Sequence, residues 1–129
     1  MAGIKRFEDI EAWKEARELT RQIYRATARG GFRKDFGLRD QIQRASVSIM
    51  ANIAEGFDGG SDREFVKFLG YAVRSSTELQ SHLYVALDQG YMGQDTFASL
   101  YGQAVRVKNL TSGFIRYLRS RPKTLHVGR

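Results

Sequence analysis

The chain has 129 residues, 21 Lys and Arg against 14 Asp and Glu, a net charge of +7 and no cysteine. Its length is typical of one domain, which buries enough surface to fold without disulfide or metal staples. The missing cysteine excludes disulfides, thiolate nucleophiles and sulfur-ligated metals. No apolar run near Met1 reads as a signal peptide, so we expect a soluble cytoplasmic protein.

Basic and acidic residues are unevenly distributed along the chain. Residues 1–95 carry 14 of each sign and sum to zero, whereas the residues after Asp95 carry seven basic side chains and no acidic one. A one-sided basic element favours binding to nucleic acid or to an acidic partner surface. The competing interpretation is that these cations complement a helix C-terminus and aid solubility. The candidate nucleic-acid-binding residues are Arg106, Lys108, Arg116, Arg119, Arg121 and Lys123.

Apolar residues at helical spacing predict a first helix over 9–29, with Asp9 as its N-cap. Trp13 has apolar neighbours three and six residues on, so we interpret it as a core residue rather than a base-stacking platform. The helix is expected to end before two glycines, and residues 30–36 are read as a short basic linker.

A second helix is predicted over 36–56, where Gly56 is expected to stop it. Ten uncharged residues, 45–54, indicate that most of its surface is buried. One apolar stripe comprises Leu38, Ile42, Ala45, Ile49 and Ile53, and a second comprises Val47, Met50, Ala51 and Ala54.

A polar row runs between those stripes and consists of Arg44, Ser48, Asn52 and Glu55. Buried polar groups must be hydrogen-bonded and buried charges paired, so the row predicts a fixed network in which both charged ends need partners. Ser75 and Glu78 on the next helix are the expected partners. Such a network can specify which helices or subunits meet; the alternative is a ligand or catalytic pocket built on Asn52 and Glu55.

A third helix is predicted over 61–89, where Ser61 and Glu64 form a capping box at its start. The glycines near residue 90 should end this helix through the left-handed conformation that glycine readily adopts. Asp95 or Thr96 is expected to cap a fourth helix over 95–120, which stops before Pro122. We expect the basic tail, residues 121–129, to be poorly ordered.

Short connections between four long helices predict an all-α, antiparallel up-down-up-down bundle in a single domain, 1–129. Glu78 and His82 are four residues apart, and a surface pair is favoured over a metal site there. The glycines match no nucleotide-binding loop. Together with the missing cysteine and the lack of a metal-ligand pattern, this leads us to expect no metal, no cofactor and no catalytic residues. We therefore expect a non-enzymatic protein.

Three segments resemble a known family: 7–24 (FEDIEAWKEARELTRQIY), 37–56 (GLRDQIQRASVSIMANIAEG) and 61–83 (SDREFVKFLGYAVRSSTELQSHL). They are similar to the bacterial four-helix bundle proteins encoded within intervening sequences of 23S ribosomal RNA genes. The resemblance implies a homopentameric ring without enzymatic activity. It also implies similarity to the accessory proteins of diversity-generating retroelement reverse transcriptases, which bind nucleic acid through basic surfaces. Arg74 departs from the family, which usually has glycine there.

Sequence and resemblance together predict a ring-forming bundle that binds RNA or DNA through the helix 95–120 and its tail, as a partner of a ribonucleoprotein or reverse transcriptase. A closed ring would repeat the basic helix around one axis, so that weak phosphate contacts act together. The alternative is an oligomeric scaffold for an acidic protein partner without nucleic-acid binding. No membrane association is expected.

Overall fold

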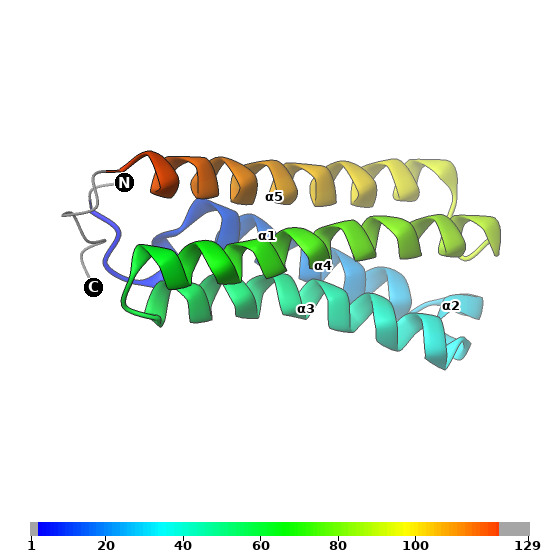
Figure 1. The fold of residues 1–129 in the computed structure, drawn as a ribbon. Helices are drawn as coiled ribbons and strands as arrows, with labels where there is room; N and C mark the ends of the chain where they lie inside the picture. The colour runs from blue at the N-terminus through cyan, green and yellow to red at the C-terminus, as the bar shows by residue number, and fades with distance from the viewer. Residues whose placement is uncertain (1–2, 122–129) are drawn as a thin grey trace.

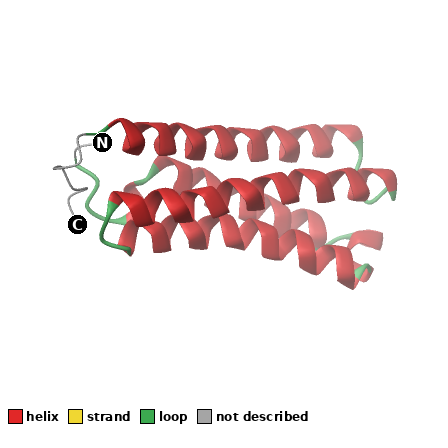
Figure 2. Cartoon of the chain, viewed as in Figure 1, coloured by secondary structure: helices red, strands yellow, loops and turns green. Residues whose placement is uncertain are grey.

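A computed structural model describes residues 3–121, and within them the chain forms five α-helices, one 3-10 turn and no strand (Figure 2). The long helices are α1 (Glu11–Thr27), α3 (Phe36–Asp58), α4 (Asp62–Asp88) and α5 (Gln94–Ser120). The 3-10 turn η1 spans Phe7–Asp9, and the short helix α2 spans Gly30–Lys34. The all-α class predicted from helical periodicity is confirmed.

The four long helices lie side by side, and each one packs against two others (Figure 1). The packed pairs are α1 with α3, α3 with α4, α4 with α5, and α5 with α1. Successive long helices run in opposite directions, because their connections are short. The helix α2 lies at the end of the bundle where α1 leads into α3, and the last turn of α5 lies at the opposite end.

The core is built from apolar residues three or four positions apart on each long helix. On α3 the predicted inner stripe is confirmed, since Ile42, Ile49 and Ile53 are fully buried. The second predicted stripe is wrong at Val47, which is 43% exposed, because a helix on one corner of a bundle buries only the faces toward its neighbours.

The start of α1 differs from the prediction. Asp9 does not cap the helix; it belongs to η1, and its carboxylate pairs with Arg6 at 3.5 Å. Ile10 occupies the N-cap position and is completely buried. Burial of this residue in the core decides where the helix begins, in place of a side-chain cap.

The predicted linker after α1 is also wrong, because residues 30–34 form the helix α2. Its anchor is Phe32, which is 1% exposed and stacks on Tyr91 with ring centroids 5.3 Å apart. The Tyr91 hydroxyl donates to an oxygen of Asp35 at 2.9 Å, and the second carboxylate oxygen of Asp35 accepts from the backbone N–H of Leu38. One buried aromatic ring therefore holds this segment against the bundle.

Gly56 does not end α3, which continues to Asp58. A Cβ at this position would lie 2.8 Å from the Cβ of Phe68 and 3.0 Å from a ring carbon of Phe65. The glycine is therefore required for close approach of α3 and α4. The turn that follows uses Gly60, whose φ is +89°, a value that glycine adopts without a steric penalty.

The boundaries of α4 and α5 lie close to the predicted ones. The Ser61 hydroxyl accepts from the backbone N–H of Glu64, which confirms the N-cap, and Gly90 has the expected positive φ of +73° after the end of α4. The N-cap of α5 is Gly93, without a side-chain cap, in place of Asp95 or Thr96. The predicted disordered tail lies outside the described residues, apart from its first residue.

Candidate nucleic-acid interface

The centre of the polar row joins α3 to α4. The hydroxyls of Ser48 and Ser75 are 2.9 Å apart, and the amide of Asn52 donates to the Ser48 carbonyl at 2.9 Å and to its hydroxyl at 3.0 Å. All three side chains are partly buried. This part of the network therefore exists within one chain and fixes how the two helices face one another.

The charged ends of the row do not behave as predicted. Arg44 and Glu55 are exposed, and neither has an ion-pair partner among residues 3–121. Glu78 turns to His82, 3.6 Å away, rather than to the row. One chain therefore leaves the ends of the row in solvent, because no helix of the bundle covers the outer edge of the α3–α4 pair.

The alternative of a pocket on Asn52 and Glu55 requires both residues to line one cleft. Glu55 lines an open cleft of about 550 Å³ with Asp58 and Phe68, but Asn52 is not part of that lining. Among the described residues, no group of three or more His, Cys, Asp or Glu could hold a metal ion.

Arg106 is neutralised by α1. Its Nε lies 3.0 Å from a carboxylate oxygen of Glu15, which also accepts from the Gln103 amide at 2.9 Å. The hydrogen bond from Gln103 is the main cause, and the Arg106 guanidinium a further one, that lowers the pKa of Glu15 below its ordinary value. The cation at residue 106 is therefore paired with a carboxylate of a neighbouring helix, at the surface of the bundle.

Arg121 is also paired. Its Nε lies 3.7 Å from a carboxylate oxygen of Asp62 on α4, its side chain is only 12% exposed, and its guanidinium lies 5.7 Å from the centre of the Tyr117 ring. Such packing fastens the end of α5 to the start of α4. This arginine has little surface to offer to a phosphate.

The remaining predicted cations of α5 form what we call the α5 basic surface, Lys108, Arg116 and Arg119. Arg116 and Arg119 are exposed, Lys108 is partly buried, and none of the three has an ion pair within the described chain. At about 100° per residue they fall within roughly 80° of one another around the helix. Lys123, the sixth predicted residue, lies outside the described residues.

The aromatic residues near this surface have separate roles. Phe114 is buried in the core. Tyr101 packs in a cluster with Tyr84 and Phe97, with ring centroids 4.9 to 5.5 Å apart. Tyr84 is 49% exposed, so this cluster offers a partly open ring face beside the start of α5.

A second group of cations was not assigned a binding role from the sequence. Arg25, Arg29, Arg33 and Lys34 are exposed, and none forms an ion pair among the described residues; we call them the α1–α2 basic surface. They fall in residues 19–34, a stretch without any Asp or Glu. The zero sum over 1–95 concealed this stretch, which a shorter window would have detected.

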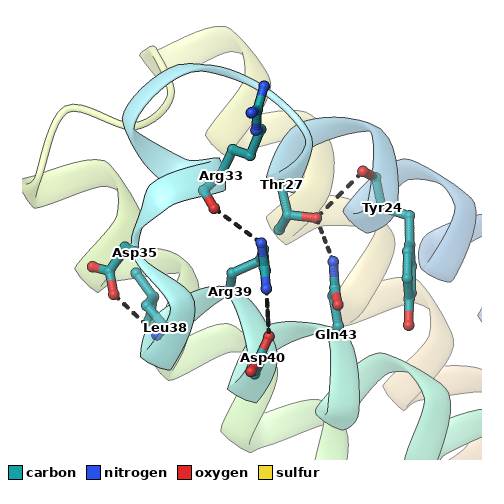
Figure 3. Close-up of polar contacts among 8 residues, drawn as sticks. All are labelled: Tyr24, Thr27, Arg33, Asp35, Leu38, Arg39, Asp40 and Gln43. Carbon is teal, nitrogen blue, oxygen red and sulfur yellow. Dashed lines mark hydrogen bonds and ion pairs between the residues drawn. The ribbon is translucent and has the colours of Figure 1, made fainter.

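Polar contacts hold the α1–α2 basic surface in position (Figure 3). Arg39 on α3 donates to the Arg33 carbonyl at 3.0 Å and pairs with Asp40 at 3.2 Å. Gln43 donates to the Thr27 hydroxyl at 3.0 Å, which joins the end of α1 to α3. These contacts therefore hold α2, and the cations that it carries, against α3.

Within residues 3–121, no helix has the length and hydrophobicity needed to cross a membrane.

Comparisons with known proteins agree with the fold. A crystal structure of a protein of unknown function from the S23 ribosomal protein family of Bacteroides thetaiotaomicron is similar, with a TM-score of 0.74 and 22% identity. The match covers 81% of this chain and 98% of that one. No curated protein matches. The family described as 23S rRNA-intervening sequence protein matches residues 8–113. The chain belongs to the 23S rRNA-intervening sequence protein family.

Proposed function

We propose that the protein is a non-enzymatic, ring-forming helical bundle that binds RNA through its two basic surfaces. The proposal depends on the pairing of the basic side chains: seven cations on these surfaces have no ion-pair partner within the described chain. Phosphate backbones supply the complementary charge, and each contact releases condensed counterions. The family description, which names a ribosomal RNA, favours RNA over DNA as the ligand.

The α3–α4 face supports self-assembly. On α4, Tyr71, Ser75, Glu78, His82 and Val85 recur at helical spacing and therefore share one side of the helix. Ser75 contacts α3 on this side, while Tyr71 is 39% and Val85 43% exposed. A neighbouring subunit on this face would cover these apolar side chains and give Arg44 and Glu55 partners.

A ring strengthens the binding proposal. Each subunit presents two basic surfaces, and α5 alone is about 40 Å long, so the surfaces lie far apart on one bundle. Repetition around a ring axis converts later contacts with one strand into intramolecular events. Assembly therefore raises the affinity for a long strand more than for a short one.

Binding is tested by fluorescence anisotropy with a labelled single-stranded RNA over a range of salt concentrations. The triple variant Lys108→Gln, Arg116→Gln, Arg119→Gln should reduce the slope of log K against log salt by about 2 units, at about 0.7 per phosphate contact. Wild-type protein that shows no salt-sensitive binding to RNA or DNA would contradict the proposal. That result would leave the scaffold for an acidic protein partner, without nucleic-acid binding, as the remaining interpretation.

Assembly is tested by light scattering after nuclease treatment. We expect a mass several times that of one chain, and the double variant Tyr71→Arg, Val85→Arg should reduce it to the monomer while circular dichroism remains helical. The matched control is Tyr24→Arg, which changes a residue that is 46% exposed on α1, a helix packed against α3 and α5 rather than α4. A monomeric wild-type protein would rule out the ring.

A further inference from the structure

A cleft of about 510 Å³ lies between the second half of α1 and the start of α5. Its wall includes Gln22 and Arg25, which are three residues apart on α1 and share one face, and Arg29, which directly precedes α2. Tyr91 and Met92, from the turn between α4 and α5, line the other side. The volume falls in the range of about 300–1,000 Å³ that is typical of small-ligand sites.

The cleft carries two cations without a carboxylate partner. Arg25 lies in the last turn of α1 and Arg29 directly precedes α2; both line the cleft, and neither has an ion pair within residues 3–121. A phosphate between them would accept charge-assisted hydrogen bonds from both guanidinium groups.

Gln22 presents an unmet acceptor at the same cleft. Its Nε2 donates to Glu18 at 3.2 Å, whereas its Oε1 is buried and has no hydrogen-bond partner in the described part of the chain. A buried carbonyl oxygen without a partner is unfavourable, so the Gln22 side chain would gain a hydrogen bond by turning this oxygen toward a ligand N–H or O–H donor in the cleft. The ligand therefore needs donors as well as a negative charge.

The remaining walls favour a ligand with a flat apolar body and a single anionic end. Ala26, Met92 and Leu100 supply apolar contacts. Tyr91 is held in place by Phe32 and by its hydrogen bond to Asp35, so its position does not depend on a ligand. Asp95 also lines the cleft; its carboxylate would repel a second phosphate and accept hydrogen bonds from sugar hydroxyls.

We propose that this cleft binds one nucleoside monophosphate unit, with its phosphate between Arg25 and Arg29 and a donor group on Gln22. The unit is either a free nucleotide or one splayed nucleotide of a single strand. In the second form the inference rests on the proposed RNA binding and deepens it, because unstacked bases are the usual targets of proteins that bind single-stranded RNA.

The test titrates the full chain with the four nucleoside 5′-monophosphates, with adenosine and with inorganic phosphate, by calorimetry and by NMR. The double variant Arg25→Gln, Arg29→Gln should weaken monophosphate binding about tenfold or more and leave the weak binding of adenosine unchanged. Gln22→Met should raise the melting temperature, because it removes the unmet acceptor. It should also weaken the binding of the monophosphates and of adenosine, because their donor group loses its hydrogen-bond partner. The matched control is Arg33→Gln, Lys34→Gln, which removes two cations of the α1–α2 basic surface that have no ion pair within residues 3–121 and do not line the cleft. This variant should bind monophosphates as wild type does.

A second arm separates the two sources of the nucleotide. Monophosphate binding in competition with a single-stranded oligonucleotide indicates a splayed nucleotide of a strand, and binding without competition indicates a free nucleotide; either result supports the cleft. No binding of any monophosphate at millimolar concentration overturns it, and so does equal weakening by the control pair. Salt-sensitive binding of a long RNA that survives in the Arg25, Arg29 variant would leave the proposed function standing while the cleft fails.

Discussion

The bundle carries two basic regions that differ in how many of their cations are ion-paired. The C-terminal stretch holds the whole positive excess of the sequence, yet two of its cations, Arg106 and Arg121, form ion pairs with carboxylates of α1 and α4. The α1–α2 basic surface belongs to a part of the chain whose charges sum to zero, yet its cations stand free of ion pairs in the described structure. Net charge along a chain therefore does not locate a binding surface.

The two regions are also held by different means. The α5 basic surface is carried by a helix of 27 residues that packs against both α1 and α4. The helix α2 has only five residues and depends on Phe32 and a few polar contacts. Its position should therefore be the more sensitive of the two to single substitutions.

The largest expected effect is on this anchor. Phe32→Ala should lower the free energy of unfolding by about 3–5 kcal/mol, because it removes a fully buried aromatic ring and leaves a cavity. Chemical denaturation measures the change. Phe36→Ala is the control: that ring is 64% exposed, and its loss should cost less than about 0.5 kcal/mol. Equal costs at the two positions would show that α2 is not anchored as described.

The next effect is on binding. Replacing Arg25, Arg29, Arg33 and Lys34 together with glutamine should reduce the salt slope for single-stranded RNA by about 3 units, compared with about 2 for the three residues of the α5 basic surface. Anisotropy at several salt concentrations gives both slopes. A variant of the α1–α2 basic surface with an unchanged slope would reverse the comparison and return the binding site to α5.

A smaller effect is expected when a cation is removed together with its carboxylate. The pairs Glu15→Gln with Arg106→Gln, and Asp62→Asn with Arg121→Gln, keep the net charge constant and remove no free cation. Each should leave the salt slope within about 0.5 unit of wild type. A fall as large as that of a free cation would mean that the ion pair opens to bind phosphate.

The smallest effect concerns pH. The pKa of Glu15 in the folded chain lies below its ordinary value of 4.5, chiefly through the Gln103 hydrogen bond. The stability that this carboxylate contributes is therefore complete above pH 4.5 and is lost as the pH falls through the folded pKa. Denaturation of wild type and Glu15→Gln should give a difference that shrinks on acidification through this window. A constant difference would contradict the assignment.

Much of the fold could be predicted from local pattern. The inner stripe of α3, the cap at Ser61 and the positive φ of Gly90 each depend on residues within a few positions of one another. The errors at Ile10, Phe32 and Gly56 have a common cause. Each residue is placed by packing against another part of the bundle, which local capping and breaking rules do not include.

The candidate site was less predictable than the fold. Sequence spacing placed Ser48, Ser75 and Asn52 in one network, and their hydrogen bonds agree with it. It could not show that Arg44 and Glu55 stay exposed, because the extent of a buried face depends on how many neighbours a helix has. The cleft beside Gln22 was also out of reach, since its walls come from residues about 70 positions apart.

The sequence by itself determined that this chain forms long amphipathic helices and that it carries an excess of positive charge, because periodicity and composition are properties of the chain alone. Only the tertiary structure decided which cations are free. Pairing requires a carboxylate within a few ångströms, and the carboxylates that neutralise Arg106 and Arg121 come from helices distant in the sequence. Packing in space, rather than order along the chain, sets the electrostatic surface that a ligand meets.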